Sequence, residues 1–136
     1  MTISTTELAT GYRASRLIKG CWQLAGGHGE VDQVQAVLDM AAFVEAGLTT
    51  FDCADHYINV EALIGRFRSE HPALAARLQV HTKCVPDYDR LTSCDRTYLT
   101  GIIDRSLERL GVEQLDLVQF HWWNLAQPGY IEALGI

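Results

Sequence analysis

The alternation of short strand-like segments with longer helical segments constrains the fold of this 136-residue chain more than any other sequence feature. The strand-like segments are rich in β-branched and aromatic residues, whereas the helical segments repeat apolar residues every three or four positions. We predict strands at residues 17–21, 48–52, 78–82 and 115–120, helices at residues 32–46, 59–67 and 99–110, and a further helix beginning at Tyr130. The apolar positions expected to form the buried stripe of the first helix are Val34, Val37, Leu38, Ala41 and Ala42.

This order favours right-handed crossover connections and a parallel sheet, that is, an α/β fold. A doubly wound sheet and a (β/α)8 barrel of the TIM type both fit the pattern. The loop Gly26-Gly27-His28-Gly29, in which we expect an exposed His28, does not match the G-x-G-x-x-G fingerprint of dinucleotide-binding doubly wound folds. We therefore predict the parallel (β/α)8 barrel type.

A complete barrel of this type needs about 250 residues. Residues 1–136 would then form one domain that supplies about the first four strands, a half-barrel. Such a half-barrel leaves two open sheet edges and an uncovered apolar face, which favours self-association. We infer that the sequence is a truncated portion of a longer protein, or a half-barrel that pairs with another chain.

The predicted helices carry recognisable boundary residues. Asp32 and Asn59 stand where an N-cap is expected, and Gly47 and Gly111 stand just beyond the helix ends, where a left-handed conformation is common.

Composition and charge exclude several classes of function. The net charge of −6 disfavours a nucleic-acid binder. There is no apolar run long enough for a membrane-spanning helix, and the polar N-terminus lacks a secretory signal, so we expect a cytoplasmic protein with no membrane partner. The four cysteines are isolated from one another and are expected to be reduced, partly buried thiols: Cys21, Cys53, Cys84 and Cys94.

Polar residues follow three successive predicted strands at their carboxyl ends, where parallel α/β folds gather reacting groups. Asp52 ends the second strand and Tyr57 follows in its loop, while Lys83 and His121 end the third and fourth strands. A lysine ammonium makes a nearby phenol a stronger acid, a carboxylate keeps a buried lysine charged, and an imidazole can hold a substrate carbonyl. Together these groups could protonate a developing alkoxide, as carbonyl reduction requires.

Six segments, in order along the chain from about Gly11 to Ile136, resemble motifs of the aldo-keto reductase family. Residues 51–57 resemble F-D-x-A-x-x-Y, residues 61–65 resemble E-x-x-I-G, and Thr82-Lys83 matches T-K. Residues 106–110 resemble S-L-x-x-L, Asp116-Leu117 with His121 matches the following strand, and residues 20–22 resemble the first-strand segment beside the nicotinamide.

The resemblance implies an NADPH-dependent oxidoreductase that reduces an aldehyde or ketone, or catalyses the reverse oxidation. It implies that Tyr57 is the general acid, Lys83 the group that strengthens it, Asp52 the partner of Lys83, and His121 the orienting residue. Gly20, Cys21, Trp22 and Asp52 would contact the cofactor, and Trp22 and Trp122 would line the substrate pocket. Most cofactor-holding residues of the family belong to the second half of the barrel, so this chain alone is expected to bind NADPH weakly and to be inactive.

Other interpretations remain open at this point. Each of the four polar residues taken alone is as compatible with a structural role, and His56 is more typical of a loop residue without a role. A metal site built from Asp52, His56 and His121 lacks a typical ligand pattern, so we expect no metal. Trp122-Trp123 could form a protein-binding patch. The chain could also be a non-catalytic regulatory relative, or a half-barrel assembly without enzymatic activity.

Overall fold

The computed structural model describes residues 3–27 and 29–136, so the expectation for His28 lies outside the described residues. The strands are β1 (Thr5–Ala9), β2 (Tyr12–Ser15), β3 (Lys19–Gly20), β4 (Thr50–Asp52), β5 (Gln79–Cys84) and β6 (Leu117–Phe120). The helices are α1 (Gln33–Glu45), α2 (Val60–Glu70), α3 (Pro72–Ala75), α4 (Arg96–Leu110) and α5 (Tyr130–Leu134), with 3-10 turns η1 (Trp22–Ala25) and η2 (Tyr88–Arg90).

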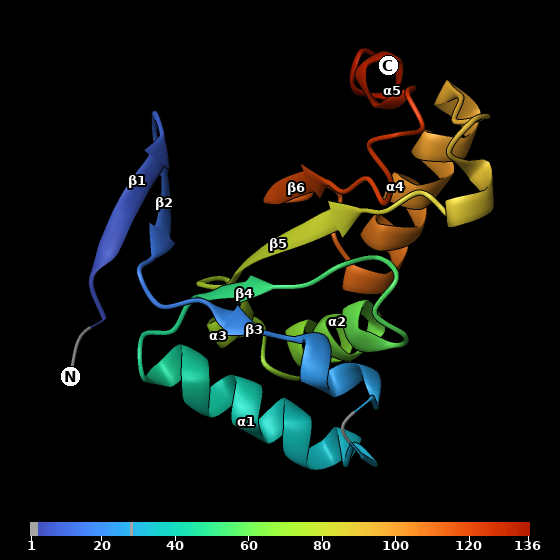
Figure 1. The fold of residues 1–136 in the computed structure, drawn as a ribbon. Helices are drawn as coiled ribbons and strands as arrows, with labels where there is room; N and C mark the ends of the chain where they lie inside the picture. The colour runs from blue at the N-terminus through green and yellow to red at the C-terminus, as the bar shows by residue number, and fades with distance from the viewer. Residues whose placement is uncertain (1–2, 28) are drawn as a thin grey trace.

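The predicted parallel α/β architecture is confirmed. Strands β3, β4, β5 and β6 form one parallel sheet in chain order, with helices connecting successive strands. Figure 1 shows α1, α2 and α3 gathered below one face of this sheet, with α4 beside β5 and β6. We call the opposite face, which would line the inside of the predicted barrel, the concave face, and Figure 1 shows none of the described helices lying across it.

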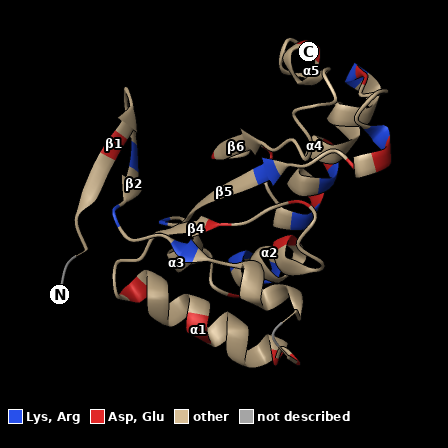
Figure 2. Cartoon of the chain, viewed as in Figure 1, with Lys and Arg blue, Asp and Glu red and all other residues tan. Residues whose placement is uncertain are grey.

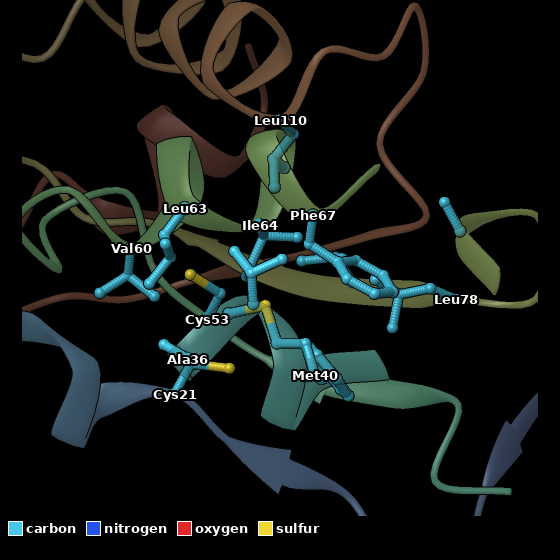
Figure 3. Close-up of a cluster of buried hydrophobic side chains, with 14 of the residues drawn as sticks. Cys21, Ala36, Met40, Cys53, Val60, Leu63, Ile64, Phe67, Leu78 and Leu110 are labelled. Carbon is cyan, nitrogen blue, oxygen red and sulfur yellow. The ribbon is translucent and has the colours of Figure 1, made fainter. Parts of the chain in front are cut away.

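The first core lies between α1, α2 and the sheet. Phe51 and Val80 point from β4 and β5 toward the helices, where they meet side chains such as Met40, Ile64 and Phe67. Figure 3 shows Met40 of α1 close to Ile64 and Phe67 of α2 in this cluster. Successive strand residues point to opposite faces, so burying Phe51 and Val80 on the helix side turns Asp52 and His81 to the concave side.

The α1 stripe differs from the prediction at three positions, because Val34, Leu38 and Ala42 are exposed. Val34 and Leu38 are 57% and 51% exposed, and the buried positions are Ala36, Val37, Met40 and Val44. The helix is therefore rotated about its axis relative to the predicted stripe. It turns Met40 and Val44 rather than Val34 and Leu38 toward β4 and α2.

The helix boundaries follow local chemistry with one exception. The Asp32 carboxylate accepts hydrogen bonds from the Val34 and Gln35 amides at 2.9 and 3.0 Å, as an N-cap does. Gly47 and Gly111 adopt left-handed φ angles of 92° and 66° beyond the ends of α1 and α4. Asn59 occupies the predicted N-cap position of α2, but its backbone is left-handed (φ 62°) and its side chain makes no capping hydrogen bond.

Gly65 allows α2 and α4 to touch at their backbones. A Cβ atom at this position would lie 2.1 Å from the Arg109 carbonyl oxygen, a separation that no side chain can occupy. The E-x-x-I-G motif therefore contains a packing requirement, because α4 approaches α2 through this glycine.

The hairpin of β1 and β2 was not predicted. It turns at Gly11 (φ 76°) and lies to one side of the parallel sheet in Figure 1. Its contacts with the sheet include a 3.0 Å hydrogen bond between the Tyr12 hydroxyl and His81 Nε2 and a 2.9 Å bond from the Ser15 amide to Thr50 Oγ1.

The region after β6 is covered less completely than the first core. A second, smaller cluster joins Cys84, Leu99, Ile102 and Ala133. Nearby apolar side chains remain exposed, namely Val118, Leu125, Ile131 and Leu134. None of the helices in the described ranges is long and apolar enough to cross a membrane.

Candidate active site

The strand register brings Asp52 and Lys83 to the same face of the sheet. Asp52 is paired with His81, and Lys83 lies two residues further along β5, so its side chain points to the same concave face. Lys83 is paired in turn with Gln119 of β6. Figure 2 shows an acidic position at the end of β4 and a basic position on β5, whereas most other charged residues lie on helices and loops.

Lys83 uses all three of its ammonium donors. Nζ lies 2.8 Å from each carboxylate oxygen of Asp52 and 2.8 Å from the carbonyl oxygen of Cys53. The Lys83 side chain is 17% exposed and that of Asp52 is 35% exposed. A partly buried ammonium is stable only when its charge and its donors are satisfied, and this arrangement satisfies both.

Tyr57 lies next to this ammonium. Its ring centroid is 5.5 Å from Lys83 Nζ, and its backbone amide donates to the Ala54 carbonyl at 3.1 Å in the loop that joins β4 to α2. The expected neighbours Asp52, Tyr57 and Lys83 are therefore brought together.

His121 follows β6 directly, and its amide donates to the Cys84 carbonyl at 3.0 Å. Its ring stands edge-on to Trp123 at 4.7 Å between centroids. His56 connects this pair to Tyr57, with ring separations of 5.7 Å to Trp123 and 4.9 Å to Tyr57. Burial lowers the pKa of His56, and the nearby His121 and Lys83 charges lower it further, so His56 is neutral near pH 7.

Two residues that the sequence reasoning did not place at the site lie there. Gln119 Nε2 is 3.5 Å from Asp52 Oδ1, and Trp123 contacts both His56 and His121 while its indole donates to the Pro86 carbonyl at 2.8 Å. The strand alternation could have indicated Gln119, because a residue paired with Lys83 in a parallel sheet shares its face. No sequence signal separates Trp123 from Trp122.

Trp122 lies in a different setting from the one expected of a pocket wall. Its ring packs against Phe120 and Tyr130, and its indole donates to the carbonyls of Asn124 and Gln127 at 3.1 and 3.0 Å. These contacts fix the loop that leads to α5. The structure thus gives Trp123, rather than Trp122, the position beside His56 and His121.

The three residues expected beside a cofactor at the end of β3 differ in how exposed they are. Nothing lies within 4 Å of a Cβ built on Gly20, and Trp22 is 54% exposed at the start of η1. Cys21 is fully buried, and burial raises the pKa of its thiol to about 12. Its amide donates to the Asp52 carbonyl and its carbonyl accepts from the Leu24 amide, so the residue presents no surface for the expected cofactor contact. All four cysteines are free thiols.

No group of three metal-ligating side chains occurs among residues 3–27 and 29–136. The alternative site of Asp52, His56 and His121 is therefore not assembled as a ligand cluster in the described part of the chain. The Asp52 carboxylate is instead engaged by Lys83.

Comparison with known proteins identifies the family to which this fold belongs. A profile of the aldo/keto reductase family matches residues 16–136. The chain is 34% identical over 123 residues to a 6-dehydroglucose reductase of Novosphingobium aromaticivorans, covering 82% of this chain and 39% of that protein. It is 32% identical over 109 residues to an aldo-keto reductase of Mycolicibacterium vanbaalenii, covering 80% and 37%.

Solved structures of aldo-keto reductases share the fold. A Klebsiella pneumoniae aldo-keto reductase in complex with NADPH superposes with a TM-score of 0.71 at 22% identity, covering 99% of this chain and 45% of that chain. A putative aldo-keto reductase of Pseudomonas aeruginosa gives 0.68 at 19% identity, covering 89% and 48%.

The chain belongs to the aldo/keto reductase family of oxidoreductases. Its parallel sheet corresponds to part of the family's (β/α)8 barrel, and the chain spans less than half the length of the relatives it matches.

Proposed function

We propose that this chain carries the catalytic residues of an NADPH-dependent reductase that converts aldehydes or ketones to alcohols. The observation that supports this most directly is the ammonium of Lys83, held on Asp52 and placed 5.5 Å from the Tyr57 ring centroid. The carbonyl substrate class also agrees with the name of one relative, a 6-dehydroglucose reductase.

The proposed chemistry divides between cofactor and protein. NADPH, when bound, supplies a hydride to the carbonyl carbon. As that C–H bond forms, the carbonyl π electrons move to the oxygen, and the Tyr57 hydroxyl transfers its proton to this oxygen to give the alcohol. The Lys83 ammonium stabilises the phenolate that Tyr57 leaves, and the Asp52 carboxylate keeps Lys83 charged and in place.

His121 would orient the substrate through a hydrogen bond from its ring to the carbonyl oxygen. His56 and Trp123 would border the substrate at this end of the face, because their rings connect those of Tyr57 and His121.

The residues at the end of β3 fit a nicotinamide in part. The open space at Gly20 admits a flat ring close to the backbone, and Trp22, which is 54% exposed, follows two residues later at the start of η1. Cys21 offers no contact to the nicotinamide, since the whole residue is buried and its amide and carbonyl are bonded within the chain. NADPH carries several negative charges, and the cations on this face are few, so we expect the isolated chain to bind it with a dissociation constant well above micromolar.

Titration of the isolated chain with NADPH, followed by the change in nicotinamide fluorescence, measures this affinity. Micromolar binding would contradict the expectation of a weak, incomplete cofactor site. Weak binding agrees with it and requires that activity be assayed at millimolar NADPH.

Carbonyl-dependent oxidation of NADPH tests the function itself. At millimolar cofactor, over long incubations and with a set of simple aldehydes, Tyr57→Phe should lower whatever rate the chain shows by about a hundredfold or more, because it removes the proton donor. Tyr88→Phe is the matched control, since Tyr88 is 60% exposed and away from Lys83. An equal rate in Tyr57→Phe and the unaltered chain, measurable above the rate without a carbonyl substrate, would refute the assignment.

A further inference from the structure

A buried carboxylate lies behind the catalytic residues, on the side of the sheet that the helices cover. Glu61 of α2 is 1% exposed. Its Oε1 accepts a 2.7 Å hydrogen bond from the Thr82 hydroxyl, and its Oε2 lies 3.4 Å from an Arg109 guanidinium nitrogen. Thr82 precedes Lys83 in β5, and the two side chains point to opposite faces of the sheet.

Arg109 connects this carboxylate to the loop that carries Tyr57. The same guanidinium nitrogen that reaches Glu61 donates to the Asp55 carbonyl at 2.9 Å. The Asp55 carboxylate in turn accepts from the Val85 amide at 3.1 Å, and the Asp55 amide donates to the Lys83 carbonyl at 3.2 Å. Glu61 and Arg109 thereby join α2, α4, β5 and the Tyr57 loop.

The negative charge of Glu61 acts on the neighbouring carboxyl group of Asp55. Burial and the Glu61 charge together raise the pKa of Asp55 to about 6. A buried carboxylate is costly unless it is fully hydrogen-bonded, and Thr82 and Arg109 supply those bonds. The close approach at Gly65 holds α4 where Arg109 can reach both Glu61 and the loop.

We propose that Glu61 is a positioning residue that fixes the Tyr57 loop against β5 and so sets the placement of Lys83 relative to Tyr57. Glu61 acts through Thr82 on one side and through Arg109 and the Asp55 carbonyl on the other. The consequence for catalysis rests on the proposed function, whereas the positioning itself can be measured without turnover.

The chain offers a selective probe because its sequence contains only two lysines, Lys19 and Lys83. Their rates of acetylation by an excess of a water-soluble N-hydroxysuccinimide ester can be followed separately by peptide mass spectrometry. Lys83 reacts slowly when Asp52 and the Cys53 carbonyl hold its ammonium. Lys19, on β3, reports any general loosening of the sheet.

Glu61→Gln should raise the Lys83 rate relative to the Lys19 rate by about tenfold, the equivalent of one lost hydrogen bond to a charged group. Glu70→Gln, on the same helix but with its carboxylate paired to Arg66 at the surface, should leave the ratio unchanged. An unchanged ratio in folded Glu61→Gln protein overturns the proposal.

A second pair of variants covers the case in which Glu61→Gln does not fold. Thr82→Val removes the hydroxyl that Glu61 accepts from while keeping the side-chain shape, and Thr82→Ser restores that hydroxyl. The proposal requires a raised Lys83-to-Lys19 ratio in Thr82→Val and a ratio near that of the unaltered chain in Thr82→Ser. Equal ratios in the two variants overturn it.

The assay at millimolar NADPH separates this proposal from the proposed function. Raised Lys83 labelling supports the positioning role whether or not the chain shows turnover, because labelling requires no cofactor. Where turnover occurs, Thr82→Val should lower kcat by about tenfold with little change in KM, since substrate contacts are untouched. Lowered kcat with unchanged labelling overturns the positioning role and leaves the reductase assignment intact.

Discussion

The two faces of the parallel sheet are built from the same strands but held by different interactions. The helix-covered face buries Phe51 and Val80 completely against α1 and α2. The concave face carries Asp52, Lys83 and Gln119, which contact one another through charge and hydrogen bonds. The difference indicates that apolar packing determines the shape of the sheet, while the residues between those packed positions are available for chemistry.

Removing a large side chain from the covered face should have the largest effect. Phe67→Ala takes a fully buried ring out of the first core and should lower the free energy of unfolding by about 3–5 kcal/mol. Urea denaturation measures the loss. Leu134→Ala, at a position 64% exposed, serves as the control and should change stability by less than about 1 kcal/mol. Equal losses would mean that the region after β6 is packed as firmly as the first core.

A change on the concave face should separate activity from stability. Lys83→Met removes the cation beside Tyr57 and should lower carbonyl reduction at millimolar NADPH by about a hundredfold. It should lower the free energy of unfolding by about 1 kcal/mol, because the Lys83–Asp52 pair is partly exposed. Lys19→Met is the matched control. A Lys83→Met chain that unfolds as readily as Phe67→Ala would contradict the division between the two faces.

The pH dependence of stability tests the surroundings of Asp55, which lies in the loop after β4. Its pKa is about 6 in the folded chain against 3.8 as the reference value, so the folded state binds this proton more tightly. The stabilisation from that proton is fully present below about pH 4 and is lost as the pH rises through 6.

Asp55→Asn should therefore gain about 2–3 kcal/mol of stability relative to the unaltered chain between pH 4 and pH 7. Urea midpoints at the two pH values measure this difference, and the asparagine oxygen can still accept the Val85 amide. Asp39→Asn, at an exposed position on α1, should show no such gain. A gain of equal size in both variants would remove the special role of Asp55.

The smallest expected effect on the fold itself concerns the sheet edge at β6. Val118 is 41% exposed on this edge strand, and we expect the chain to self-associate through such open edges. Val118→Lys should lower the mass measured by light scattering toward that of a single chain, while changing unfolding by less than about 1 kcal/mol. A single-chain mass for the unaltered protein would contradict the expectation.

The order of strands and helices could be predicted because each buried element repeats its apolar residues at a characteristic spacing. The same reasoning placed Asp52 and Lys83 at strand ends, where the structure joins them. The β1–β2 hairpin escaped prediction because β1 is exposed along its whole length and so carries no apolar alternation.

Features that depend on contacts between distant elements could not be predicted. Glu61 was expected only as the first residue of the E-x-x-I-G motif, without a role, and its partners come from β5 and α4. The choice between Trp122 and Trp123 is made by the loop after β6, where Asn124 and Gln127 capture the Trp122 indole. Side-chain spacing within one element contains no information about such partners.

The hairpin of β1 and β2 has a consequence for how the molecule opens. It is attached to the sheet by Tyr12 and by the short segment around Ser15, rather than by a cluster of large apolar groups. Residues 3–15 should therefore detach in a local unfolding event that leaves the four parallel strands intact, with faster amide hydrogen exchange in β1 than in β5. Each such event exposes His81 and the start of β4 to solvent for its duration.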